Sequence, residues 1–104
     1  MAETRQHLAL TYEGAATVLA AAVRRTEEIG ARQCIAVTDD GGYLLAFGRT
    51  DGGKATNLRG GLPIVVDGHL IGAIGVGSGT GEQDVEVAAA GVAALAGAKD
   101  WTNE

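Results

Sequence analysis

The sequence predicts one α+β domain over residues 1–104, in which an antiparallel β-sheet of at least four strands packs against a helix from each end of the chain. Three observations support this fold class: a helical pattern near the N-terminus, two hairpin patterns in the middle, and a second helical pattern near the C-terminus. A chain of 104 residues suits a single domain. Because only 4% of the residues are aromatic, its core has to be aliphatic.

The first helix is expected to begin at Tyr12 and to end at Gly30. Thr11 is the predicted N-cap, because a threonine hydroxyl can accept a hydrogen bond from the free N–H groups of the first turn. Apolar residues then recur at helical spacing on one face, namely Ala15, Val18, Leu19, Ala22, Val23 and Ile29.

A first hairpin is predicted from two apolar runs, Cys34–Thr38 and Tyr43–Phe47, which flank the turn sequence DDGG. A second hairpin is predicted from the runs 64–66 and 69–76, which flank Asp67-Gly68. This pair suits the positive φ angles of a type I′ turn. The connection between the hairpins is too short for a helix, so we expect antiparallel pairing throughout.

The last strand has two different faces if its side chains alternate strictly. One face carries Ile71, Ala73, Gly75 and Gly77, and the other carries Leu70, Gly72, Ile74 and Val76. We expect the alanine-rich helices to approach the first, nearly bare face. The face with Val37, Ile74 and Val76 would then be uncovered, and an uncovered apolar face usually indicates a partner or a ligand. The chain is therefore expected to form a homodimer or a higher homo-oligomer.

The second helix is expected over 81–96, with Gly97 as its C-cap. Thr80 is the predicted N-cap, and Gln83 completes a capping box. The predicted apolar face consists of Val85, Ala88, Ala89, Val92 and Leu95. In the polar tail, Trp101 either docks on the surface or frays.

The composition argues against several classes of partner. A formal net charge of −5, with no run of basic residues, gives no electrostatic surface for nucleic acid. The N-terminus lacks a signal-peptide pattern, and no stretch has the ~18 unbroken apolar residues that a membrane span needs. The single cysteine, Cys34, is expected to be a buried thiol. These features predict a cytoplasmic protein without nucleic-acid or membrane partners.

Three segments resemble the GlcG/HbpS-like family of small bacterial proteins: VTDDGGYLLAFGRTDG, GGLPIVVDGHLIGAIGVGSGTGEQD and AAAGVAAL. The resemblance extends from about Thr11 to Leu95. Its motif residues are Asp39, Gly42, Leu44, Arg49 and Asp51, then Gly60–Pro63, then Gly72–Val76 with Gln83, Asp84 and Gly91. Some members of this family are described as haem-binding, and some are fused to cobalamin adenosyltransferases of the PduO type. The resemblance implies a profilin-like, GlcG-like fold and a small-molecule ligand, with haem as the possible cofactor.

Two departures from the family pattern affect what can be transferred. Members usually carry a helical segment between the two hairpins, whereas here only 48–59 joins them. The glycine loop usually reads like GVSGGTP, and here it is GVGSGTG. The serine has moved by one position, and Gly81 replaces the proline that begins the helix.

The glycine loop from Gly75 to Gly81 fits neither a dinucleotide-binding fingerprint nor a P-loop. What remains is a helix N-terminus, whose N–H groups near Ser78, Gly79 and Thr80 can bind a carboxylate or phosphate in principle. Glu82 and Asp84 would place negative charge where that anion would sit. A tight corner, in which backbone passes close to backbone, is therefore the favoured interpretation.

The leading functional hypothesis is a small-molecule-binding accessory protein of the GlcG/HbpS-like kind. A solvent-exposed imidazole is the ordinary interpretation of His69, and an axial haem ligand is the functional one. No spacing of histidine, cysteine or carboxylate predicts a dedicated metal site. The predicted ligand-binding residues are Arg59, Gly61, His69, Ser78, Gly79 and Thr80.

The alternative hypothesis is a small pathway enzyme, such as an isomerase, lyase or cyclase, that acts on a small organic acid or ketone in a pocket between subunits. Arg49 or Arg59 would then hold the substrate carboxylate. A proton would be moved by one of three carboxylates, and the candidates are Asp51, Glu82 and Asp84. A third hypothesis is a subunit that only assembles with another protein.

Overall fold

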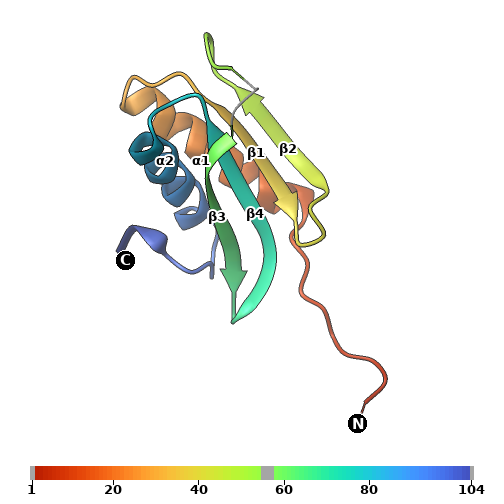
Figure 1. The fold of residues 1–104 in the computed structure, drawn as a ribbon. Helices are drawn as coiled ribbons and strands as arrows, with labels where there is room; N and C mark the ends of the chain where they lie inside the picture. Colours follow the sequence, from red (N-terminus) through yellow and green to blue (C-terminus); the bar gives the residue numbers. More distant parts are fainter. Residues whose placement is uncertain (1, 55–57, 104) are drawn as a thin grey trace.

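A four-stranded antiparallel sheet with the strand order β2-β1-β4-β3 forms the centre of the protein (Figure 1). The computed structural model describes residues 2–54 and 58–103, and of residues 58–60 and 103 it describes the backbone only. The elements are α1 (Tyr12–Glu28), β1 (Cys34–Asp39), β2 (Leu44–Arg49), β3 (Leu58–Val66), β4 (His69–Gly77), α2 (Gly81–Ala93) and a 3-10 turn, η1 (Trp101–Asn103). The predicted fold class is confirmed.

The N-caps predicted for both helices are present. The Thr11 hydroxyl accepts a hydrogen bond from the Gly14 N–H at 3.0 Å. At the start of α2, the Thr80 hydroxyl accepts from the Gln83 N–H at 3.1 Å, and the Gln83 side-chain oxygen accepts from the Thr80 N–H at 3.0 Å. These bonds satisfy N–H groups that have no partner within a helix.

Helix α2 ends at Ala93, three residues before the predicted end, and its C-cap is Ala94 rather than Gly97. The chain leaves the helix because its next residues bind the edge of β3. The Lys99 N–H donates to the Val65 carbonyl at 2.7 Å. The Trp101 indole N–H donates to the Pro63 carbonyl at 2.9 Å, so the tryptophan docks on the surface.

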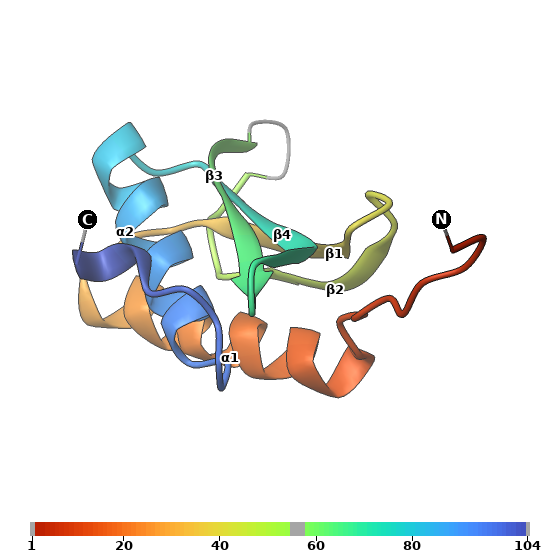
Figure 2. The ribbon, with the colours of Figure 1, turned by 90° about the horizontal axis from the view of Figure 1, so that it is seen from below.

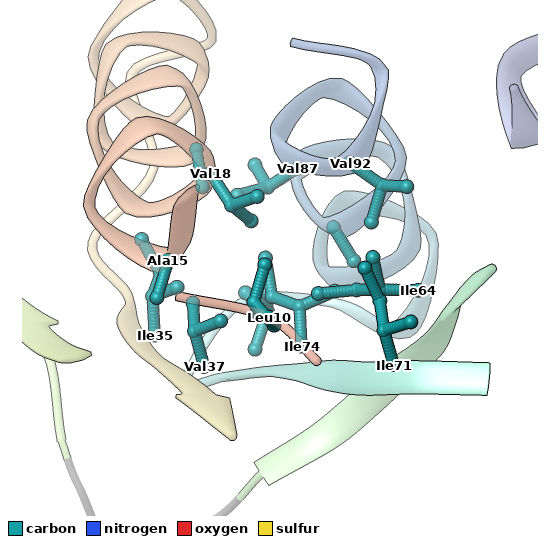
Figure 3. Packing of buried hydrophobic residues seen from close by; sticks show 13 residues of the cluster. Leu10, Ala15, Val18, Ile35, Val37, Ile64, Ile71, Ile74, Val87 and Val92 are labelled. Carbon is teal, nitrogen blue, oxygen red and sulfur yellow. The ribbon is translucent and has the colours of Figure 1, made fainter. Parts of the chain in front are cut away.

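Both helices cover the same face of the sheet (Figure 2). Helix α1 lies against β1 and β2, and α2 lies against β3 and β4. The buried side chains between these layers (Figure 3) include Ile35 and Val37 from β1, Ile64 from β3, and Ile74 and Val76 from β4. This core is aliphatic, as the composition predicted.

The predicted assignment of the sheet faces was wrong. Ile74 is 1% exposed and Val76 is 0% exposed, and both lie beneath the helices, whereas the bare set with Ala73 and Gly75 faces away from them. Burial of large aliphatic side chains stabilises the fold by roughly 1.5–3 kcal/mol each. The free energy gained by burying Ile74 and Val76 outweighs any advantage of bringing the helices closer to the face that carries glycine and alanine.

The alternation along β4 is also interrupted by a β-bulge. Ile64 pairs with Gly72, but the next residue, Val65, pairs with Leu70. Ile71 is therefore an extra residue on β4, and it is buried in the core. Strict alternation had placed it on the opposite face from Ile74.

Helix α2 turns most of its predicted apolar face to the core, since Ala88, Ala89 and Val92 are buried, but Val85 is not part of that face. Val85 is 47% exposed, whereas Val87 and Ala88 are fully buried. The two helices approach closely at Gly91, where an added Cβ would lie 3.0 Å from the Val18 carbonyl oxygen. Within the part of the chain that the structure describes, no helix has the length and apolarity to cross a membrane.

Candidate functional site

The face of the sheet that the helices leave uncovered is lined mainly by small side chains. Directly paired residues of antiparallel strands lie on the same face, so the strand registers define this surface. We call it the open face. It consists of Leu44, Phe47 and Arg49 from β2, Cys34, Ala36 and Thr38 from β1, Ala73, Gly75 and Gly77 from β4, and Gly61 and Pro63 from β3.

The segment after β2 crosses one end of the open face and contacts the glycine loop there. The Cys34 thiol donates to the Lys54 carbonyl at 3.0 Å, and the Lys54 N–H donates to the Ser78 hydroxyl at 3.0 Å. Ser78 has a positive φ of 78°, a backbone conformation that costs a non-glycine residue about 1–2 kcal/mol. The segment after β2 is thus in direct contact with Ser78.

Positive charge gathers at this end of the open face, and we call it the basic end. Arg49 donates to the Gly53 carbonyl at 3.5 Å, and Arg32 lies against Gly52. Arg32, Arg49 and Lys54 are all exposed, as is Asp51. Arg59 belongs to β3, but its side chain lies outside the described residues, so its predicted role stays a prediction.

Asp84 is fully buried and belongs to an interior hydrogen-bond network rather than to an open cleft. Its Oδ1 atom accepts from the Gln33 side-chain amide at 2.9 Å and from the Gly79 N–H at 3.1 Å. The Gln33 side-chain oxygen accepts from the Thr26 hydroxyl at 2.7 Å. This network joins α1, the residue before β1, the glycine loop and α2.

The glycine loop has few donors left for an anion. The Gly79 N–H is bound by Asp84 and the Thr80 N–H by Gln83. An added Cβ on Gly79 would lie 2.7 Å from the Gln33 side-chain nitrogen. These contacts favour the tight-corner interpretation, in which glycine is needed for a close approach.

Glu82 is exposed on the outer side of α2, where it lines a hollow of about 870 Å³ together with Arg25, Val85 and Trp101. Arg25 donates to the Glu86 carboxylate at 2.7 Å. The hydrogen bonds to Glu86 and Glu28 raise the pKa of the Arg25 guanidinium. The proposed catalytic use of Arg49, Asp51, Glu82 and Asp84 stays a prediction.

His69 begins β4, whereas the Ser78 corner follows the end of that strand. Nine residues of extended chain separate them by about 26 Å. The predicted ligand residues therefore fall at two opposite ends of the sheet. Gly61 lies between them, on a shallow hollow of about 360 Å³ in the open face.

His69 lies beside the N-terminal arm, the residues that precede α1. The sequence did not predict the position of this arm. His69, His7 and Leu8 line a hollow of about 420 Å³. An adjoining hollow of about 300 Å³ is lined by the two histidines together with Arg5, Asp40 and Leu70. The His7 Nε2 atom lies 3.1 Å from the Asp40 carboxylate. We call this end of the sheet the histidine end.

The fold and these surfaces define a small α+β protein with one open sheet face. The sequence profile of the family described as "Haem degrading protein HbpS-like" matches residues 10–59 and 51–93. The chain belongs to this HbpS-like family. The match comes in two pieces that overlap at residues 51–59, in the segment between the two hairpins.

Solved structures share this fold. A double mutant of Streptomyces reticuli HbpS is 26% identical, with a TM-score of 0.81, over 89% of this chain and 91% of that chain. Klebsiella pneumoniae protein ORFY is 23% identical, with a TM-score of 0.83, over 91% and 96%. A PduOC:haem complex is 18% identical, with a TM-score of 0.76, over 89% and 99%. Among curated proteins, none matches the chain significantly.

Proposed function

We propose that the protein is a haem-binding accessory protein that acts as an oligomer, with the histidine end as its haem site. Membership of a family described as haem degrading supports haem as the ligand. The observation that carries the location is that both histidines of the chain line the same hollow. When bound, haem supplies an iron that takes nitrogen ligands and carries redox chemistry.

The histidine end offers an iron ligand. His69 is exposed and lies at the start of β4, directly after the hairpin turn, so its imidazole can reach a flat ligand that lies in the hollow. His7 is oriented by its contact with Asp40, and carboxylates commonly orient metal-binding imidazoles in this way. His69 would ligate the haem iron, and His7 would be the second imidazole of the site.

The same surface offers the other contacts that haem needs. Leu8 is 41% exposed and Leu70 is 53% exposed, and they supply apolar contact for the porphyrin ring. Arg5 lines the adjoining hollow and could pair with a propionate group. A hollow of about 420 Å³ lies within the range of roughly 300–1,000 Å³ typical of ligand pockets.

Titration of hemin into the purified protein tests this proposal. We expect a shifted Soret band that saturates, and we expect His69→Ala to weaken binding by at least about tenfold, since even residues that only orient a ligand contribute 10–100-fold. Gln6→Ala is the matched control, because Gln6 lines the same hollow but offers no imidazole. Wild-type binding in His69→Ala would remove His69 as the ligand, and no Soret shift in the wild type would remove the haem site.

A further inference from the structure

We propose that the hollow on the outer side of α2 binds a small organic cation, an ammonium group carried on an apolar or aromatic frame. This hollow, which we call the α2 hollow, has a volume of about 870 Å³ and lies between α2, the Arg25 side chain of α1 and the turn η1. It shares no lining residue with the hollows of the histidine end or of the open face. The site therefore goes beyond the proposed function and does not depend on haem.

The floor of the α2 hollow is apolar. Val85 is 47% exposed, and Ala89 and Ala90 follow it one turn further along the helix and line the same hollow. A helix face that looks away from the core normally carries polar side chains. Here the exposed valine offers apolar contact, and the short alanine side chains leave room for a ligand.

Trp101 forms a wall of the α2 hollow, and several contacts hold it in place. Its indole N–H donates to the Pro63 carbonyl at 2.9 Å, and the Lys99 ammonium lies 4.1 Å from the centre of its ring. The Lys99 N–H donates to the Val65 carbonyl at 2.7 Å, and η1 packs beside α2 (Figure 1). Sites for small molecules are usually formed before the ligand arrives, and this wall meets that condition.

Arg25 reaches the α2 hollow from α1, but carboxylates of the protein already neutralise its charge. It donates to the Glu86 carboxylate at 2.7 Å and to the Glu28 carboxylate at 3.4 Å. A ligand carboxylate would have to displace one of these partners to form the paired hydrogen bonds that arginine offers. Arg25 therefore fixes the position of Glu86 and is not available to hold an anion.

The charges around the α2 hollow favour a cation. Two of the residues that line it are acidic, Glu82 and Glu86, and one is basic, Arg25. Lys99 and Asp100, which lead into η1, add one charge of each sign. Within the described part of the chain Glu82 takes part in no ion pair, and it is exposed. A cation would gain a carboxylate partner here, whereas an anion would be repelled.

The N-terminus of α2 does not reverse this preference. Gly81 lines the hollow at the first position of the helix, where the helix dipole contributes roughly half of an elementary positive charge. Glu82, in the same turn, carries a full negative charge. The start of the helix is thus negative on balance.

The aromatic wall, the apolar floor and the carboxylate together define the class of ligand. A tryptophan ring attracts cations that lie over its face, and the Lys99 ammonium already lies there. A volume of about 870 Å³ is within the range of roughly 300–1,000 Å³ that is typical of ligand pockets. We expect an arylalkyl ammonium ion to place its ring against Trp101 and Val85 and its charged nitrogen at Glu82.

Titration with phenethylamine, which is protonated at neutral pH, tests the proposal. Trp101 is the only tryptophan of the chain, so tryptophan fluorescence reports on this wall of the hollow alone. We expect a saturable change in emission with phenethylamine. The neutral analogue, phenethyl alcohol, should bind about fivefold more weakly, because it lacks the ion pair with an exposed carboxylate. The anionic analogue, hydrocinnamate, should bind more weakly still.

Three variants locate the site. Glu82→Gln should weaken phenethylamine binding by about fivefold and remove the preference for the amine over the alcohol. Ala90→Leu should abolish saturable binding, because leucine suits a helix and fills the hollow. Glu13→Gln is the matched control, because Glu13 is likewise exposed in the first turn of a helix but does not line the hollow. It should bind like the wild type, and circular dichroism establishes that each variant is folded.

Every outcome supports or overturns the proposal. An emission that does not saturate with phenethylamine, or saturable binding that Ala90→Leu retains, overturns the site. Equal or tighter binding of hydrocinnamate, or an undiminished affinity in Glu82→Gln, overturns the assignment of a cation. Trp101 emission that changes on dilution of the protein, without a response to phenethylamine, would identify a second copy of the chain as the occupant and also overturn the proposal. Failure of haem binding leaves these results unchanged.

Discussion

Ile74→Glu is expected to unfold the protein. Ile74 is 1% exposed and lies in the centre of the sheet beneath both helices (Figure 3). Loss of its side chain leaves a core defect that costs about 2–5 kcal/mol, and burial of a carboxylate without a partner costs several kcal/mol more. The total approaches the 5–15 kcal/mol that typically separates folded from unfolded proteins. Far-UV circular dichroism and thermal unfolding measure the effect.

Phe47→Glu is the control for this prediction, because it places the same charge in the same sheet, on β2, but on the open face. We expect it to remain folded, with a melting temperature close to that of the wild type. If Ile74→Glu melts cooperatively near the wild-type temperature, the assignment of Ile74 to the helix-covered face is contradicted.

Asp84→Ala is expected to destabilise the protein by about 2–6 kcal/mol. The substitution removes the acceptor of two buried donors, the Gln33 amide and the Gly79 N–H, and each unsatisfied buried group costs about 1–3 kcal/mol. At roughly 4–8 °C per kcal/mol for a domain of about this size, the melting temperature should fall by at least about 8 °C. Differential scanning calorimetry measures this shift.

Two variants separate the hydrogen-bond network from other effects. Asp84→Asn keeps an acceptor oxygen and should lose less stability than Asp84→Ala. Glu82→Ala, in the same first turn but exposed, should cost no more than about 1 kcal/mol from the helix dipole. Equal losses for Asp84→Asn and Asp84→Ala would show that the accepted hydrogen bonds are not the cause.

Local patterns predicted the elements of the fold well, because the interactions that define them are local. Thr11, the Thr80–Gln83 capping box and the Asp67-Gly68 turn each act within four residues. The same patterns could not tell which face of the sheet the helices cover. Alternation sorts side chains into two sets, but the choice between the sets and the bulge at Ile71 depends on packing against distant helices.

The candidate sites show the same difference between local features, which the sequence predicts, and long-range contacts, which it does not. The motifs identified Ser78 as a candidate residue, but they did not predict its contact with Lys54, which lies 24 residues away. The burial of Asp84 depends on Gln33, which is 51 residues away and belongs to no motif. The neighbourhood of His69 includes the N-terminal arm, whose path has no signature in the sequence.

The central claim is that His69 binds haem iron at the histidine end. Electron paramagnetic resonance of the ferric haem-loaded protein tests this claim most directly. It reports the axial ligands of the iron rather than the affinity alone. We predict the signature of an imidazole-ligated haem in the wild type, the same spectrum in Gln6→Ala, and loss of that signature in His69→Ala. An imidazole-ligated spectrum that is unchanged in His69→Ala, or no imidazole ligation in the wild type, would contradict the claim.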